Sequence, residues 1–302
     1  MGMSLARKTI NFTSGVVDFA VLLAAVILIA FSGYALWDAN QVYEAAKSEN
    51  YAIYKPGTEE GGLSFGELQE INDEVFAWLT VYGTSIDYPV AQGEDNMKYV
   101  YTNAEGRYAA SGSVFIDYKN SRDFSDFNTI FYGHHMASPA MFGDIGKFRD
   151  EEYFAARKYG NLYFDGKDHG IEFFSFLHTD VHNYDVFCPK VTGAEKQQAY
   201  LDGLMEISIY TRDIGVTIED NIILLTTCSS ESTNGRDILT GRLTDEVFED
   251  TLIGLPAERG LFAGIQSKAW MFANISPILI FLLILVILLG VIFKALDRLI
   301  KV

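Results

Sequence analysis

Two long apolar runs stand near the two ends of the chain. Residues 19–37 and residues 270–293 contain no charged side chain. As helices rising 1.5 Å per residue they would measure about 28 Å and about 36 Å, long enough to cross the hydrocarbon core of a bilayer. A cleaved signal peptide and a buried core helix are the alternatives, but signal-peptide cores are shorter and core helices carry a polar face. The pattern favours two transmembrane helices.

Basic residues flank both runs on the sides that face the chain ends. Because basic flanks stay on the cytoplasmic side of a membrane, we expect residues 1–18 and 294–302 to be cytoplasmic. The segment between the two helices is then extracytoplasmic. The basic residues of the two flanks are Arg7, Lys8, Lys294, Arg298 and Lys301.

Between the two runs the chain changes to shorter apolar patterns. We expect a juxtamembrane helix and linker over residues 38–62, a folded domain over 63–255 and a second linker over 256–269. Ser64 followed by Glu67 predicts a capping box that opens a short helix. Further helices are expected at residues 141–148, 151–158 and 194–204.

Most of the central segment reads as short strands bounded by turn-forming residues. Many short strands with a few inserted helices favour a mainly β domain with a closed or nearly closed barrel. The expected strands cover residues 76–81, 112–118, 129–132, 162–164, 171–177, 221–227 and 237–243.

Composition narrows the possible functions. The 302 residues are 49% hydrophobic and carry a formal net charge of −17, which repels the phosphates of nucleic acids. We therefore expect no nucleic-acid partner. Two cysteines, Cys188 and Cys228, are too few for a disulfide framework.

Cys228 is a candidate nucleophile. It ends the apolar run 221–227, and the polar loop after it leads to Arg236. A thiol at a strand end beside a returning cation is one way to activate a sulfur nucleophile, although a buried structural cysteine is the alternative. If the two strands pair antiparallel, Arg236 returns opposite Cys228, whereas Arg242 lies about 20 Å further along. Cys188 has no such surroundings.

The histidines offer a second group of candidates. His134 and His135 follow the strand 129–132, and neighbours on an extended segment point to opposite sides, so one of them can face Cys228. His178 and His182 have the spacing of a helical metal motif, but their context reads as strand and no glutamate follows the first histidine. We therefore expect no metal site. The stretch 143–147 is too short between its glycines for a phosphate loop.

Several local motifs occur together over about residues 63–250, in a fixed order, and they resemble the sortase family, class B sortases most closely. The first two are Trp78 with residues 83–90 (Gly-Thr-Ser-Ile-Asp-Tyr-Pro-Val), and residues 92–99 (Gln-Gly-Glu-Asp-Asn-Met-Lys-Tyr). The others are residues 112–117 (Gly-Ser-Val-Phe-Ile-Asp), Tyr132-Gly133-His134, Met141-Phe142, Leu225-Thr226-Thr227-Cys228 and Gly235-Arg236.

The resemblance implies a fold and an activity. The fold is an eight-stranded sortase barrel with inserted short helices, here flanked by two transmembrane helices. The activity is that of a cysteine transpeptidase that joins surface proteins to the cell envelope of Gram-positive bacteria, with neither cofactor nor metal. Carried over by motif, Cys228 is the nucleophile, His134 the general acid/base and Arg236 the oxyanion-stabilising cation. Asn96, Thr226 and Thr227 are substrate-binding residues by the same resemblance.

The partners implied are proteins with a C-terminal sorting signal, and an amine acceptor that is either a peptidoglycan precursor or a pilin lysine. A C-terminal anchor resembles the pilus-assembling sortases, yet their Asp-Pro-aromatic lid motif is absent before Leu63. Leu224 replaces a family threonine, and Ser229-Ser230 replaces the acidic residue often found after the cysteine. Anchoring to the wall and pilin polymerisation both stay open. So do a non-catalytic sortase-fold binding protein and a metal-dependent hydrolase that uses His178 and His182.

Overall fold

The computed structural model describes residues 2–57, 64–136, 139–228 and 234–252. They divide into two compact units, one with the N-terminal helix up to Gln41 and one that begins at Val42. Helix α1 (Gly2–Ala45) is continuous, so the expected membrane helix and juxtamembrane helix form one element. Among the described residues its segment Phe12–Ala45 is long and apolar enough to cross a membrane. The second apolar run, 270–293, and the expected segments 256–269 and 294–302 lie outside the described residues.

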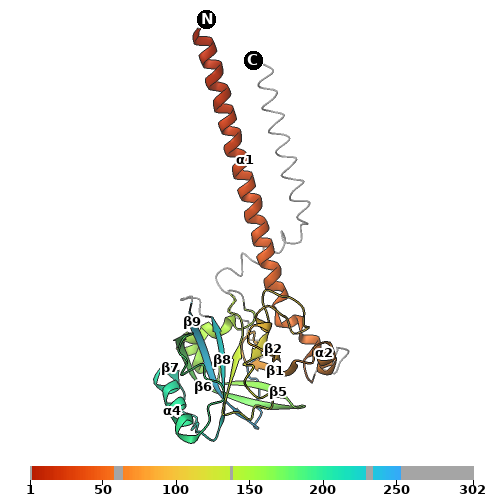
Figure 1. Ribbon diagram of the computed structural model, residues 1–302, viewed down its shortest axis with the longest axis vertical. Coiled ribbons are helices and arrows are strands. Elements are labelled where there is room, and N and C mark those ends of the chain that lie inside the picture. Colours follow the sequence, from red (N-terminus) through yellow and green to blue (C-terminus); the bar gives the residue numbers. More distant parts are fainter. Residues whose placement is uncertain (1, 58–63, 137–138, 229–233, 253–302) are drawn as a thin grey trace. The chain divides into compact units, whose positions relative to one another are not determined.

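The described strands of the second unit form one sheet, in the order β5-β1-β2-β3-β4-β8-β9-β6-β7, and β5 also pairs with β6. That pairing closes eight strands into a barrel and leaves β7 attached to the outer edge of β6 (Figure 1). The predicted mainly β, eight-stranded barrel is confirmed. The strands are β1 (Val75–Val81), β2 (Asp87–Ala91), β3 (Val114–Ile116), β4 (Asn128–Tyr132), β5 (Tyr159–Phe164), β6 (Lys167–Asp180), β7 (Ser208–Thr211), β8 (Asn221–Cys228) and β9 (Gly235–Thr244).

Two strands were not expected from the sequence. β2 contains Pro89 and β7 has only four residues, half of them exposed, so neither shows a strong strand pattern. The other strands fall where expected, with boundaries that differ by a few residues.

Short helices connect the strands. They are η1 (Ser48–Asn50), η2 (Ala52–Tyr54), α2 (Phe65–Ile71), η3 (Lys98–Val100), η4 (Gly143–Arg149), α3 (Glu151–Ala156) and α4 (Ala194–Glu206). The predicted capping box of Ser64 and Glu67 is present at the start of α2. The helix expected over 141–148 is instead the 3-10 helix η4, because Met141 has a positive φ of 50° and cannot belong to a regular helix.

The two faces of β8 pack into different hydrophobic clusters. Ile223 and Leu225 belong to the large cluster that fills the barrel. Ile222 and Leu224 belong to a second cluster, which α4 covers with Tyr200, Leu201 and Leu204. Since side chains alternate along a strand, the second cluster marks the outer face of the barrel at β8.

The folded unit begins earlier than the expected Leu63. Ala46, Tyr51 and Tyr54 are buried in the large cluster, and the Tyr88 hydroxyl donates to the Ala46 carbonyl at 2.8 Å. These residues lie in single turns and short 3-10 helices, which have no periodicity for a sequence pattern to reveal. The stretch before residue 58 is therefore part of the domain rather than a linker.

We expect a chain that begins at Ser64 to be less stable than one that begins at Val42. Burying a tyrosine-sized apolar side chain contributes roughly 1.5–3 kcal/mol, so losing Tyr51 and Tyr54 should lower the free energy of unfolding by several kcal/mol. Urea unfolding of the two chains measures the difference. Equal midpoints and slopes would contradict the burial of these residues.

Candidate active site

The predicted catalytic residues lie at or just beyond the ends of three neighbouring strands, β4, β8 and β9. Cys228, the last residue of β8, pairs across the antiparallel ladder with Arg236 of β9. On the other side of β8, Tyr132 of β4 pairs with Thr226, and the Gly133 amide still donates to the Thr226 carbonyl at 3.2 Å. The pairing of β4 with β8 ends at Tyr132 and Thr226, and His134 follows two residues later. If the chain continued in the same register, His134, Cys228 and Arg236 would form a row across adjacent strands, which are about 4.8 Å apart.

The outer face of the barrel at the ends of β8 and β9 can be identified from neighbouring residues. Leu224 and Thr226 alternate onto one face of β8, and Leu224 packs in the cluster under α4. Ile238 of β9 packs in the same cluster, so Arg236, two residues before it, shares that face. Figure 1 shows α4 on the outside of the barrel, beside β6 and β7.

His134 is half-buried and has a defined tautomer. Its Nε2 lies 2.9 Å from the Val100 carbonyl oxygen. Because a carbonyl can only accept, Nε2 must carry the hydrogen, and Nδ1 is the nitrogen that can gain or lose a proton. The backbone carbonyl of His134 accepts from the Phe142 amide at 3.0 Å, which ties the segment after β4 to the start of η4.

His135 faces the other way. Its Nδ1 is buried and has no hydrogen-bond partner among the described residues. A Cβ placed on Gly146 would lie 3.8 Å from the His135 ring and 3.6 Å from the Asp237 carboxylate, so both groups border this glycine. Burial lowers the pKa of His135, although the negative charge of Asp237 opposes that shift. A neutral, inward histidine is not in position to exchange protons at Cys228.

The register separates the two candidate arginines as the sequence predicted. Arg236 is half-buried, and its Nη1 donates to the Gly235 carbonyl at 3.0 Å. Arg242 pairs with Ile222, six positions along the ladder from Cys228, and is bonded to Glu172 at 2.6 Å. The expected antiparallel return of Arg236 opposite Cys228 is therefore confirmed.

His178 and His182, the two histidines considered as metal ligands, have different partners. His178 Nδ1 lies 2.9 Å from a carboxylate oxygen of Asp237, inside the barrel end. His182 is exposed and pairs with Asp180 at 2.7 Å. In the part of the chain that the structure describes, no group of three potential metal ligands comes together.

Asn96, Thr226 and Thr227, the expected substrate-binding residues, differ in how their polar side-chain atoms are bonded. The Asn96 amide donates to Asp117 at 2.7 Å and accepts from the Tyr118 amide at 3.0 Å, so its polar atoms bind the loop itself. Thr226 and Thr227 are buried, and both hydroxyls lack a partner among the described residues. As neighbours on β8 they face opposite sides, and Thr226 shares the outer face with Leu224.

Tyr132 borders the same site. Its hydroxyl donates to Asp117 at 3.0 Å. Burial, followed by the negative charge of Asp117, raises the pKa of Tyr132 well above its ordinary value. The phenol therefore stays protonated and acts as a hydrogen-bond donor at the end of β4.

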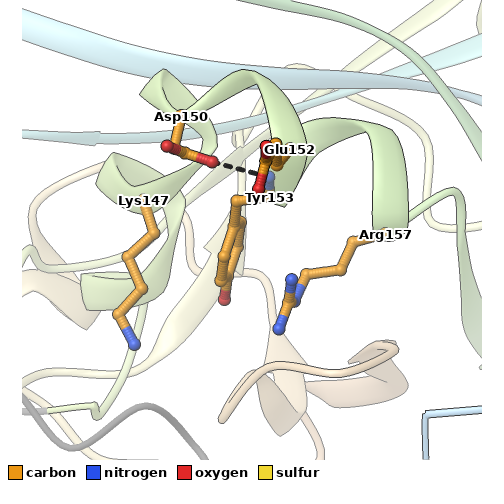
Figure 2. A pocket seen from close by; sticks show the side chains of 5 residues that line it. All are labelled: Lys147, Asp150, Glu152, Tyr153 and Arg157. Atoms are coloured by element: carbon orange, nitrogen blue, oxygen red, sulfur yellow. Dashed lines mark hydrogen bonds between the residues drawn. The ribbon is translucent and has the colours of Figure 1, made fainter.

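A pocket lies elsewhere, between η4 and α3. Figure 2 shows Lys147 and Arg157 on either side of Tyr153, with Asp150 and Glu152 above them. The Arg157 guanidinium stacks 3.5 Å from the centre of the Tyr153 ring, and its Nε donates to the Gly83 carbonyl. None of the predicted site residues lines this pocket, so it is separate from the Cys228 row.

Cys188 lies on the connection between β6 and β7. Its side chain is exposed, and its carbonyl accepts from the Asn128 side chain at 2.7 Å. Cys188 takes part in none of the described strand pairings, whereas Cys228 pairs with Arg236.

Known proteins share this arrangement. A scan of protein-family models finds no match. Sortase B of Listeria monocytogenes is 34% identical over 181 residues, which cover 59% of this chain and 72% of the relative. The solved structure of a sortase B from the type II pilus of Streptococcus pneumoniae is 43% identical, with a TM-score of 0.54, over 61% of this chain and 99% of that one. A Streptococcus pyogenes class B sortase involved in pilus biogenesis is 35% identical, with a TM-score of 0.56, over 63% and 100%.

The closed eight-stranded barrel agrees with the match in fold to solved class B sortases. Together with the identity over most of the Listeria relative, this shows that the chain belongs to the class B sortases, which are cysteine transpeptidases.

Gly133 should be sensitive to the smallest enlargement. A Cβ at this position would lie 2.6 Å from the ring of Phe142, which is fully buried. We expect Gly133→Ala to lower the free energy of unfolding by about 1–3 kcal/mol through overpacking, and to lower activity because His134 is the next residue. Thermal unfolding and peptide cleavage measure the two effects.

Gly203→Ala is the matched control. Gly203 lies in α4 with no atom within 4 Å of an added Cβ. The same substitution there should raise stability by up to about 1 kcal/mol, since alanine favours helices. Equal effects at both positions would contradict the contact between Gly133 and Phe142.

Proposed function

We propose that this chain is a membrane-anchored transpeptidase that cleaves a C-terminal sorting signal of surface proteins through a thioacyl intermediate. The observation that carries the proposal is the pairing of Cys228 with Arg236 on adjacent strands, with His134 two residues past the end of the neighbouring strand β4. A sulfur nucleophile, a proton carrier and a cation side by side are what acyl transfer requires. These three groups are sufficient without a metal or a cofactor.

The first half-reaction forms the thioester. The Cys228 thiolate attacks a backbone carbonyl carbon of the sorting signal, and Arg236 stabilises the negative charge that develops on the oxygen. Protonated His134 then gives its Nδ1 proton to the leaving amine as the carbon–nitrogen bond breaks. The Nε2 hydrogen bond to Val100 holds the ring so that Nδ1 is the nitrogen used. Thr226 and Thr227 are buried and Asn96 is bonded within its own loop, so the three shape the site through the structure around them.

The second half-reaction transfers the acyl group to an amine. The incoming amine attacks the thioester, neutral His134 takes its proton, and the carbon–sulfur bond breaks to restore the thiolate. We propose an amine of a cell wall precursor as the acceptor. One solved relative is described as a Staphylococcus aureus sortase B–substrate complex and another as sortase B complexed with triglycine, both 27% identical to this chain. A short glycine peptide is a chemically suitable amine donor.

A pilin lysine is the second candidate acceptor. Its support is the 43% identity to the Streptococcus pneumoniae pilus sortase and the 35% identity to the Streptococcus pyogenes enzyme. The chemistry at Cys228 is the same for both acceptors, so only the amine that resolves the thioester distinguishes them.

We further propose that the barrel is extracytoplasmic, that both termini are cytoplasmic and that residues 19–37 and 270–293 cross the cell membrane. The support is the apolar helix Phe12–Ala45 and the basic flanks of both runs. Reporters fused after Val302 and inserted within residues 57–62 should read cytoplasmic and external, respectively. An external signal from the C-terminal fusion would overturn this topology.

Cys228→Ala should abolish thioacyl formation, whereas Cys188→Ala should retain most activity because Cys188 is exposed and remote from His134 and Arg236. Mass spectrometry of the full chain in detergent, mixed with a panel of Asn-Pro-x-Thr-Asn-like and Leu-Pro-x-Thr-Gly-like peptides, detects the thioester.

Adding triglycine or a lysine-bearing pilin subunit identifies the acceptor by the product formed. A wild-type chain that binds these peptides without forming a thioester would favour a non-catalytic sortase-fold protein. Loss of cleavage on adding a chelator would favour the metal-dependent hydrolase instead.

A further inference from the structure

A buried ionic cluster lies directly behind the proposed catalytic row. Each residue of the row has a neighbour on the opposite, inner face of the sheet: His135 follows His134, Thr227 precedes Cys228 and Asp237 follows Arg236. Thr227 and Asp237 are cross-strand partners, and both are buried. Asp237 is the only acidic residue of β9, and no sequence motif singles it out.

Arg149 holds both carboxylate oxygens of Asp237. Oδ1 accepts from Arg149 Nη2 at 2.7 Å, and Oδ2 lies 3.4 Å from Arg149 Nε. His178 Nδ1 lies 2.9 Å from the same Oδ1 and 2.8 Å from Arg149 Nη2. One nitrogen cannot accept from the guanidinium and donate to the carboxylate at once, so the pair with Arg149 is the interaction that fixes Asp237. The side chain of Asp237 is only 1% exposed, so its charge requires these partners. Charge-assisted, forked hydrogen bonds of this kind fix geometry more narrowly than apolar packing does.

The helix that supplies Arg149 is also tied to His134. The Phe142 amide donates to the His134 carbonyl, and η4 begins at the next residue and ends at Arg149. The Tyr210 hydroxyl donates to the Arg149 carbonyl at 3.0 Å, which fixes the end of η4 to β7. One short segment therefore connects the His134 side of the row to the Arg236 side.

We propose that Asp237 is a positioning residue of the transfer reaction: its ion pair with Arg149 fixes β9 at the rung where Arg236 lies opposite Cys228. This inference rests on the proposed roles of Arg236 and Cys228. Asp237 lies on the face of the sheet away from the peptide and does not act on it. It acts through its neighbour, because a displacement of one strand residue moves the next, and a misplacement of about 1 Å can cost roughly 100-fold in rate.

The test compares Asp237→Asn with its parent in the full chain in detergent, on a Cys188→Ala background in which a thiol reagent titrates Cys228. We expect kcat per titrated thiol to fall about 10–100-fold with KM nearly unchanged, because an oxyanion donor acts mainly in the transition state. A purely structural role would lower the thermal unfolding midpoint and leave kcat per thiol of the folded protein unchanged. Such a result would overturn the proposal.

Glu172→Gln is the matched control. Glu172 of β6 and Arg242 of β9 form another carboxylate–guanidinium pair that holds β9, six positions from Arg236 along the ladder. Breaking that pair should leave kcat per thiol within about twofold of the parent, as expected for distant, independent sites. An equal loss in both variants would overturn the specific role of Asp237.

Arg236→Ala separates this proposal from the proposed function. Alone, it should lower kcat about 10²–10³-fold. Adding Asp237→Asn to it should then change kcat by less than about twofold, because Asp237 acts through the arginine that is gone. Multiplicative losses would overturn the positioning role while the catalytic role of Arg236 stands. An unimpaired Arg236→Ala variant would overturn that catalytic role itself.

If Asp237→Asn does not fold, the double variant Asp237→Leu with Arg149→Met replaces the pair with apolar side chains, a change that proteins often tolerate. A folded double variant with the reduced kcat supports the proposal. A folded double variant with the parent's kcat overturns it.

Discussion

The register between β8 and β9 is the constraint on which the rest of the site depends. Because side chains alternate along each strand, a slip of one residue would turn Arg236 into the barrel and Asp237 toward the peptide-binding face. The pairing of Cys228 with Arg236 is the last rung of an unbroken eight-rung ladder. β9 is paired along its whole length with β6 on its other side, and β4 pairs with β8. Both catalytic strands are therefore fixed from two directions.

β8 lies between two hydrophobic clusters, and this position explains its apolar composition. Its inner residues complete the filling of the barrel, and its outer residues lie under α4. A strand buried on both faces reads as a continuous apolar run rather than an alternating one. Leu224, which replaces a threonine of the family pattern, is fully buried in the outer cluster. Its packing under α4 is a physical reason for an apolar side chain at that position.

The end of the barrel near Cys228 is polar where most of its interior is apolar. Asp237, Arg149 and His178 meet there, and His135 borders them. Polar groups in such a place lower stability unless every one of them is paired. In return, these polar groups have a fixed relative orientation, since hydrogen bonds restrict angles and distances more narrowly than apolar contacts do. A site that must align three strand ends benefits from that precision.

The sequence alone determined the features that depend on neighbours in the chain. The N-terminal apolar helix, most strands, the capping box of Ser64 and Glu67, and the return of Arg236 opposite Cys228 could all be predicted, because alternation and local motifs are written within a few residues. The early start of the domain at Val42, the short strand β7 and the pairing of Asp237 with Arg149 could not. Arg149 and Asp237 are 88 positions apart, and only barrel closure and the path of η4 bring them together. Contacts at such separations follow from the closed sheet as a whole, which no local pattern encodes.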